Sequence, residues 1–560
     1  MEEDCLSASH GGGDFPRSVV ADLHLLFNGE VLKYFEVVNR LQRLCIYSTE
    51  EGFRIDVQNG HPIRCIYYSA EEGAESTCRI GVRYFAFIIQ QRSVMKRFLT
   101  GILFVAACLQ AWGQAERSRI DSLIAAMLPE GSEVGISVYD LTEKKPLYTY
   151  RDTKLSRPAS TMKLLTAVAF LSRADARTPF RTEVWHDGTI ERDTLKGNLY
   201  VVGGFDPEFD DEAMDSLVSA VRAFPISVID GQVYGDVSMK DSLYWGNGWA
   251  WDDNPEAYQP YLSPLMFCKG AVKVIAVPSA QQGDTARLVF TPSSSYYTAD
   301  NRTKTRTPSA GKFSVSRGWL ENDNRLVVKG NVASVRTGWV NLYHSESFFM
   351  HTFVERLHAA GVAAPASYAF CPLPLEGAGH IARWETPVQK VLDQLMKESD
   401  NLNAEALLCR LGAHATGKKG VAAEDGLKEV EALIRLLGHD PKSYKLADGS
   451  GLSNYNYLSP ALLVDLLKYA YSRTDIFRSL YKSLPIAGID GTLKFRMKKT
   501  AAAGNVHAKT GSFTAINALA GYLKRKNGNQ VAFAIMNQNV FPAAKARAFQ
   551  DKVCEVLVAE

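Results

Sequence analysis

Three short polar strings, far apart along a chain of 560 residues, place the strongest constraint on its fold. They are Ser160-Thr161-Met162-Lys163, Ser399-Asp400-Asn401 and Lys509-Thr510-Gly511. Each string alone is a weak signal, and the S-x-x-K spacing occurs again at Ser93, Ser309 and Ser479. The ordered combination is the informative feature, so we predict that the fold brings these three strings into one site.

The first string has the composition of an activated serine. A serine hydroxyl is a poor nucleophile until a base removes its proton. On a helix, Ser160 and Lys163 lie on one face, so the lysine is the predicted base. Residues 164–171 are nearly all apolar, which predicts a buried helix, and burial lowers a lysine pKa because it disfavours the ammonium. A base that works near pH 7 needs the pKa of Lys163 to fall by roughly 2–3 units from about 10.4.

The second string is expected to serve the leaving group and the substrate backbone. Ser399 and Asn401 follow a predicted helix over residues 387–397 and fit a short loop. We expect Ser399 to relay a proton to the leaving amine, and Asn401 to donate a hydrogen bond to the substrate backbone.

The third string precedes a predicted strand over residues 517–524, which places it on an expected edge strand. There Lys509 and Thr510 would bind a substrate carboxylate, and Gly511 would let the substrate backbone approach closely. Lys509 must then stay charged, whereas the predicted base must be neutral.

Each string also has a purely structural interpretation. Ser160 could cap a helix, with Lys163 as a surface charge. Ser399-Asp400-Asn401 could cap a helix that starts near Leu402, and Lys509-Thr510-Gly511 could be the ordinary start of a strand. The order of the strings and their flanking residues favour the catalytic interpretation.

The sequence around the strings resembles the class C low-molecular-mass penicillin-binding proteins, the D-alanyl-D-alanine carboxypeptidase/endopeptidase family of the penicillin-binding protein 4 type. The resemblance extends from about Ile120 to the C-terminus, and the long separation of Ser160 from Ser399 is typical of this subgroup. The similar segments are residues 157–167, 398–408, 448–460, 484–497 and 507–522.

The resemblance implies an α+β multidomain protein. Its penicillin-binding/transpeptidase-like catalytic domain, an antiparallel sheet flanked by helices, would be split by a β-rich insertion. It also implies a serine-type D-Ala-D-Ala carboxypeptidase, with endopeptidase activity left open, that acts on peptidoglycan stem peptides through a Ser160 acyl-enzyme and is inhibited covalently by β-lactams. No cofactor and no metal are implied, and a homodimer is left open.

By the same resemblance, the backbone N–H groups of Ser160 and Ser512 form the oxyanion hole. Many relatives carry arginine after the string DGSGLS, where Asn454 stands in this chain. Lys509 and Thr510 would then carry more of the contact with the substrate carboxylate. The expected catalytic residues are Ser160, Lys163, Ser399 and Asn401, and the expected substrate-binding residues are Lys509, Thr510, Gly511 and Ser512.

Two other functions fit parts of the pattern. A class A β-lactamase needs a glutamate that activates the deacylating water, usually in an E-x-x-L-N string. In this chain Ser399 stands where that glutamate would precede Leu402-Asn403. A non-catalytic peptidoglycan-binding envelope protein is the third interpretation, which the intact nucleophile and base argue against.

The N-terminal region predicts export to the periplasm or cell envelope. Residues 95–113 have the charged start, apolar centre and small final residues of a secretory signal peptide. We therefore expect Met95 to be the true start and residues 1–94 to be an upstream mistranslation, with a small N-terminal domain as the alternative. Val105-Ala106-Ala107-Cys108 also resembles a lipoprotein box, which would anchor the chain to a membrane through a lipidated Cys108.

The remaining chain divides by composition. Residues 116–183 and 343–560 are expected to form the split catalytic domain, with inserted β-rich domains at 184–342. The net charge of +2 gives no electrostatic case for nucleic-acid binding. The segment Trp249-Ala250-Trp251-Asp252-Asp253 could be a sugar-stacking platform, although an aromatic core beside an acidic turn is favoured.

Overall fold

The computed structural model describes residues 44–49, 52–57, 117, 119–174 and 177–559. The chain divides into two units, Met1–Leu109 and Gln110–Glu560. In the first unit, strands β1 (Leu44–Thr49) and β2 (Gly52–Val57) pair antiparallel. The rest of residues 1–94, the expected signal peptide at 95–113 and Cys108 lie outside the described residues, and those predictions stay open.

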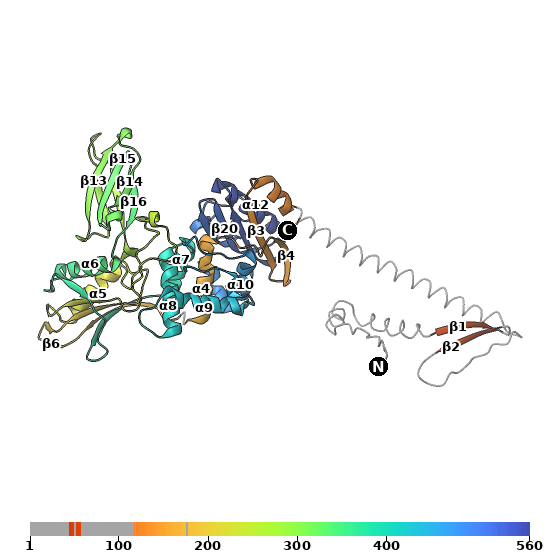
Figure 1. Ribbon diagram of the computed structural model, residues 1–560, viewed down its shortest axis with the longest axis horizontal. Coiled ribbons are helices and arrows are strands. Elements are labelled where there is room, and N and C mark those ends of the chain that lie inside the picture. Colours follow the sequence, from red (N-terminus) through yellow and green to blue (C-terminus); the bar gives the residue numbers. More distant parts are fainter. Residues whose placement is uncertain (1–43, 50–51, 58–116, 118, 175–176, 560) are drawn as a thin grey trace, which may run out of the picture. The chain divides into compact units, whose positions relative to one another are not determined.

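A five-stranded antiparallel sheet in the second unit joins strands from both ends of that unit (Figure 1). Its strand order is β19-β20-β21-β3-β4, and β21 pairs with β3 along its full length. We call residues 119–174 and 387–559 the sheet domain, and residues 177–386 the insertion. The strands are β3 (Glu133–Asp140), β4 (Lys145–Tyr150), β19 (His507–Phe513), β20 (Ile516–Lys524) and β21 (Gln530–Gln538).

The two faces of this sheet carry side chains of different size. Large side chains on one face, such as Ile136 and Phe533, pack with α12 (Ala543–Ala559) and a helix over residues 119–127. The other face carries several alanines of β20 and β21 and packs with helices α4 (Met162–Arg173) and α10 (Pro460–Ser472). Small residues on that face let the helices approach the sheet closely.

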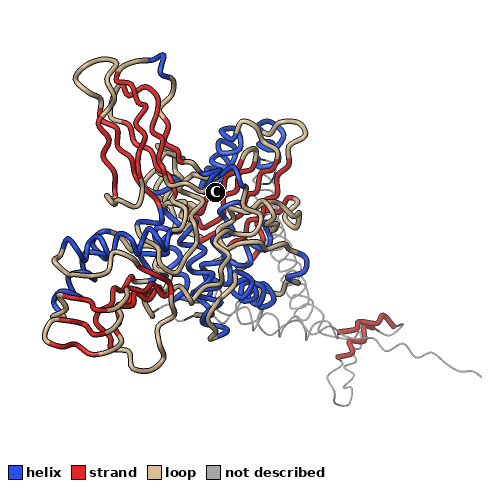
Figure 2. Tube along the Cα trace, turned by 60° about the vertical axis from the view of Figure 1, so that its left-hand side comes forward, coloured by secondary structure: helices blue, strands red, loops and turns tan. Residues whose placement is uncertain are grey.

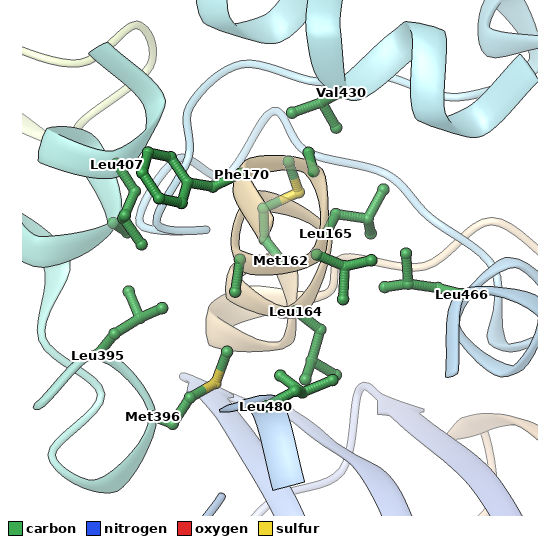
Figure 3. Packing of buried hydrophobic residues seen from close by; sticks show 14 of the residues in the cluster. Met162, Leu164, Leu165, Phe170, Leu395, Met396, Leu407, Val430, Leu466 and Leu480 are labelled. Atoms are coloured by element: carbon green, nitrogen blue, oxygen red, sulfur yellow. The ribbon is translucent and has the colours of Figure 1, made fainter. Parts of the chain in front are cut away.

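Helix α4 is the centre of the helical layer (Figure 3). Its residues 162–170 are all buried, as expected for a helix that is apolar on every side. Met162, Leu164, Leu165 and Phe170 project in different directions toward the surrounding helices. These helices are α7 (Val388–Lys397), α8 (Asn401–Thr416), α9 (Ala423–Leu436), α10 and α11 (Thr474–Ser483).

The insertion contains a mixed sheet covered by two helices, α5 (Asp211–Ala223) and α6 (Ser345–Ala359). The order of this sheet is β17-β10-β8-β5-β18. Its strands are β5 (Phe180–His186), β8 (Leu199–Gly203), β10 (Val233–Asp236), β17 (Tyr368–Phe370) and β18 (Gly379–Thr386).

Three further sheets of three strands each complete the insertion, and Figure 2 shows its strands in red. One sheet is β12-β11-β16, formed by Arg287–Thr291, Ala271–Val277 and Arg336–Asn341. The second is β13-β15-β14, formed by Thr298–Thr305, Arg325–Val332 and Ser314–Arg317. The third is β6-β7-β9, formed by Thr189–Glu191, Thr194–Lys196 and Val228–Asp230.

The insertion extends further than the sequence predicted. Residues 343–386 were assigned to the catalytic domain, but β18 pairs antiparallel with β5, and β17 pairs in parallel with β10. Phe348 and Phe353 of α6 also pack in the core of the insertion. The chain therefore returns to the sheet domain at α7. A helical pattern in a sequence does not specify which domain's core the helix joins, so the composition change at 343 was a poor boundary marker.

The α+β fold class is confirmed by this architecture. Helix α7 occupies all but the first of the predicted residues 387–397, and α8 begins at Asn401, beside the start near Leu402 that the capping interpretation expects. Across the residues that the structure describes, no helix combines the length and apolarity needed to cross a membrane.

Candidate active site

The three strings meet in the sheet domain, as predicted. The Nζ atom of Lys163 lies 3.0 Å from Ser160 Oγ and 2.6 Å from Asn401 Oδ1. The Nζ atom of Lys509 lies 2.8 Å from Ser399 Oγ. Side chains from α4, the start of α8 and strand β19 thus form one polar cluster.

Ser160 lies in a short turn just before α4. The turn Ala159–Thr161 is a 3₁₀ helix, and Ala159 has the unusual positive φ of 45°. Such backbone strain costs about 1–3 kcal/mol and is typical of functional sites. The turn is held by a hydrogen bond of 2.7 Å from the hydroxyl of Thr161 to the carbonyl of Pro158. Ser160 is half-exposed between two buried neighbours, so its hydroxyl is the accessible group of the turn.

Lys163 is completely buried and has three hydrogen-bond acceptors. They are Ser160 Oγ, Asn401 Oδ1 and the carbonyl of Ser450, which lies 2.7 Å from Nζ. Burial lowers the pKa of Lys163 to about 8, although three nearby carboxylates act in the opposite direction. Once deprotonated, the amine has a lone pair that can accept the proton of the Ser160 hydroxyl.

A loop after α9 supplies the third acceptor. Its residues Asp448–Ser453 fold around the Asp448 carboxylate, which accepts hydrogen bonds from the backbone N–H groups of Gly451 (2.8 Å) and Ser453 (2.7 Å). Glu405 of α8 accepts from the N–H groups of Gly449 and Ser450, at 3.1 and 2.8 Å. Glu405 and Asp448 lie in segments that resemble the family, 398–408 and 448–460, but the resemblance implies no role for either carboxylate.

Ser399 and Asn401 flank Asp400, the residue that precedes α8. Ser399 has a positive φ of 62°, and Asp400 caps the helix by accepting a hydrogen bond of 3.0 Å from Asn403 N–H. The amide nitrogen of Asn401 donates to the carbonyl of Tyr258 in the insertion, at 2.7 Å. One hydrogen of that amide is therefore used inside the protein, which leaves the second for a substrate.

Strand β19 lies at the edge of the sheet, which confirms the predicted edge position. Lys509 is completely buried, and its Nζ donates to Ser399 Oγ and to the carbonyl of Thr510, both at 2.8 Å. Burial lowers the pKa of Lys509 well below its ordinary value, and the charge of Lys163 lowers it further. The sequence predicted a charged Lys509, but the free site contains no anion that pairs with its Nζ among the described residues.

Gly511 has a packing role beside the predicted approach of the substrate backbone, which stays a prediction. A Cβ atom at this position would lie 2.5 Å from the carbonyl oxygen of Pro158 and 3.0 Å from the N–H nitrogen of Ser160. The glycine is thus needed for contact between β19 and the turn that carries Ser160, within the protein itself. The neighbouring Ser512 donates from Oγ to Asn517 Oδ1 at 3.0 Å, and Thr510 Oγ1 lies 2.8 Å from Thr492 Oγ1.

The insertion contacts this site through residues that lie outside the three strings, and Trp249 alone among the following examples was singled out in the sequence. Lys269 donates to Glu208 at 2.6 Å and lies 3.0 Å from the Asp400 carboxylate. The indole N–H of Trp249 donates to Asp448 at 2.9 Å. The third is Tyr258, through its carbonyl. These residues lie in irregular segments of the insertion, where no sequence motif marks them.

The structure also describes the tryptophans of the segment 249–253 and Asn454, which the sequence analysis singled out. Trp249 is half-buried against Asp448, whereas Trp251 is 70% exposed and contacts the ring of Trp319. Asn454 is exposed, and its carbonyl accepts a hydrogen bond of 3.2 Å from Arg157 Nε. Neither contact assigns a ligand to these residues.

Comparisons with known proteins find a family and relatives for most of this chain. The model of the D-Ala-D-Ala carboxypeptidase 3 (S13) family matches residues 117–559. The chain is 31% identical over 441 residues to the D-alanyl-D-alanine carboxypeptidase of Actinomadura sp. (strain R39), covering 75% of this chain and 80% of that protein. It is 27% identical over 427 residues to D-alanyl-D-alanine carboxypeptidase DacB of Haemophilus influenzae, covering 72% and 85% of the two chains.

A solved structure shares the fold. The crystal structure of penicillin binding protein 4 (dacB) from Haemophilus influenzae superimposes with a TM-score of 0.70 at 23% sequence identity. The superposition covers 79% of this chain and 99% of that one.

Proposed function

The chain belongs to the D-Ala-D-Ala carboxypeptidase 3 (S13) family, and from this premise we propose that Ser160 is the nucleophile with which it removes the terminal D-alanine from peptidoglycan stem peptides. It is a serine-type D-alanyl-D-alanine carboxypeptidase. The observation that carries the assignment is the 3.0 Å contact between Ser160 Oγ and Nζ of Lys163, a buried lysine whose pKa is lowered to about 8. Endopeptidase activity on cross-links at the same site is part of this proposal.

Lys163 starts the reaction as a neutral amine. It takes the proton of the Ser160 hydroxyl while Oγ attacks the carbonyl carbon between the two D-alanines. The developing oxyanion is held by the backbone N–H groups of Ser160 and Ser512. Such a donor contributes about 10²–10³ in rate. The close approach of Gly511 to the Ser160 turn supports this assignment, because it brings the two N–H groups near each other.

Ser399 and Asn401 act on the two sides of the scissile bond. As the C–N bond breaks, Ser399 Oγ, which contacts Lys509 Nζ, relays to the departing amine of D-alanine the proton that Lys163 took from Ser160, so that the lysine is neutral again for deacylation. Asn401 holds Lys163 through Oδ1 and donates its free amide hydrogen to the substrate backbone. After D-alanine leaves, water hydrolyses the Ser160 ester and regenerates the free serine.

Lys509 and Thr510 bind the terminal carboxylate of the substrate. An anion beside Lys509 would oppose the effects that lower its pKa, so substrate binding restores the ammonium that the free site disfavours. The carboxylate of a β-lactam would be held in the same way. Because Asn454 replaces the arginine of many relatives, Lys509 is the main cation in this contact.

The setting of the enzyme is also a proposal. The family's substrate lies in the cell envelope, so we place the mature protein in the periplasm or at the envelope, without a nucleic-acid partner. Lipidation at Cys108 and homodimer formation are further parts of this proposal.

Mass spectrometry of the penicillin-treated protein tests the nucleophile. We expect one adduct per chain, mapped to the peptide that contains Ser160, and none in Ser160→Ala. An adduct on Ser309 or Ser479 would contradict the assignment, and rapid release of hydrolysed penicillin would favour a β-lactamase. Release of D-alanine from a pentapeptide measures the native activity in parallel.

A further inference from the structure

Two buried carboxylates lie beneath the catalytic lysine without contacting it. The side chains of Glu405 and Asp448 belong to residues that are 4% and 1% exposed. Both carboxylates influence the charge of Lys163 electrostatically, although its three acceptors are a hydroxyl, an amide and a backbone carbonyl. The mechanism described above does not use either carboxylate.

Glu405 instead holds the backbone that touches the lysine. Its Oε1 accepts from the N–H groups of Gly449 and Ser450, at 3.1 and 2.8 Å, and the carbonyl of Ser450 then lies 2.7 Å from Lys163 Nζ. Asp448 fixes the other side of the loop through Gly451 N–H. One residue, Ser450, therefore connects the two groups, because its N–H donates to the Glu405 carboxylate and its carbonyl accepts from the lysine amine.

Charge couples the same two groups. Burial, together with the charge of Asp448, raises the pKa of Glu405, whereas burial lowers the pKa of Lys163, so the two pKa values approach each other. A protonated Glu405 no longer stabilises the lysine ammonium, so a proton on either group weakens binding of a proton to the other. The two groups can thus share one proton across neutral pH.

We propose that Glu405 is a positioning residue that orients Lys163 through the Ser450 carbonyl and sets its protonation by taking up the shared proton. This inference rests on the proposed role of Lys163 as the base. In the active arrangement the proton is on Glu405 and the lysine is neutral. The base then remains usable at a lower pH than a lysine beside a permanently charged carboxylate would allow.

Other charged groups surround this cluster and have to be considered. Asp400 opposes the effect of burial that lowers the pKa of Lys163, and the charge of Lys163 adds to the effect of burial that lowers the pKa of Lys509. Lys269 and Glu208 extend the cluster from the insertion, where Lys269 pairs with both Glu208 and Asp400. On α8 itself, burial raises the pKa of Cys409, one turn further along the helix, and the charge of Glu405 adds to that effect. Asp400 and Asp448 stay in place in the test variant, so its effect isolates Glu405.

The test is the pH dependence of Ser160 acylation by penicillin in wild type and Glu405→Gln. Glutamine keeps an oxygen acceptor for the loop but removes the charge, so the pKa of Lys163 should fall. We expect the acid limb of the acylation rate to move to lower pH by about one unit, with plateau activity retained within about 10-fold. The exposed Glu424 on α9 provides the control Glu424→Gln, which should leave the profile unchanged.

A limb that stays in place while the rate falls equally at every pH would overturn the proposal, because a purely structural role gives that result. If Glu405→Gln does not fold, infrared titration of the wild type decides the question. A carboxylic-acid carbonyl band should appear near pH 7, and its absence there would equally overturn the proposal. Absence of the penicillin adduct on Ser160 in the wild type would instead contradict the proposed function. Failure of the proposed function and failure of the Glu405 proposal are therefore distinguishable.

Discussion

The site contains two fully buried lysines in contrasting surroundings. Around Lys163, three carboxylates from α8 and the 448–453 loop act against the effect of burial. Around Lys509, on the edge strand, the Nζ atom contacts one hydroxyl and one backbone carbonyl, and the nearest charge influencing its pKa is the like charge of Lys163. The first environment leaves a lysine poised to exchange a proton. The second leaves a lysine that gains a partner only when an anion binds.

The largest effect is expected at the proton-exchanging lysine. Lys163→Arg keeps a positive charge, but a guanidinium does not deprotonate in a protein and cannot act as a base. Acylation by penicillin and by a D-Ala-D-Ala peptide should fall by about 10³-fold or more. Stopped-flow acylation rates measure this directly. If Lys163→Arg were acylated as fast as Lys509→Arg, the proposed difference between the two lysine environments would be contradicted.

Lys509→Arg should have a smaller effect, about 10–100-fold. Arginine still binds a carboxylate, but the completely buried position must accommodate a larger side chain. The loss should appear mainly in KM, because the ion pair holds the substrate in both the ground and transition states. An uncharged ester or amide of the D-alanine carboxylate is the control substrate, and it should be affected much less by this substitution.

The smallest effect is expected where the insertion contacts the site. Lys269→Ala removes a partly exposed cation that contacts Asp400 and Glu208, so kcat/KM should fall by about 3–10-fold. Lys273→Ala is the matched control, since Lys273 lies over the ring of Trp339 in the insertion. Equal activity of both variants would show that the contact of Lys269 with Asp400 does not support the position of Ser399 and Asn401.

The sequence predicted the residues that perform chemistry better than the residues that hold them. Ser160, Lys163 and Asn401 come from motifs whose spacing reflects the reaction, and the structure brings them within hydrogen-bond distance. Glu405 and Lys269 lie outside the three strings, and their positions depend on contacts between distant segments. A sequence pattern reports the periodicity of one element, but it does not report which other element covers it.

Two differences illustrate this limit in physical terms. The sequence predicted that residues 343–386 belong to the catalytic domain, yet α6 lies in the core of the insertion because Phe348 and Phe353 pack there. The glycine of the third string was correctly singled out, but the atom that excludes a side chain is the carbonyl oxygen of Pro158. In both cases the sequence did not show which distant segment packs against these residues.

The pairing of β3 with β21 has a consequence for folding. Val134 lies opposite Asn537 in the sheet. During translation, β3 can therefore pair with β21 only after some four hundred further residues have been synthesised. Such long-range pairing is slow to form because a long loop must close first. The Ser160 turn also needs β19 against it, so the nucleophile is assembled only in a nearly finished chain. Partly synthesised chains should therefore be inert toward penicillin, and reactivity should report completion of the sheet.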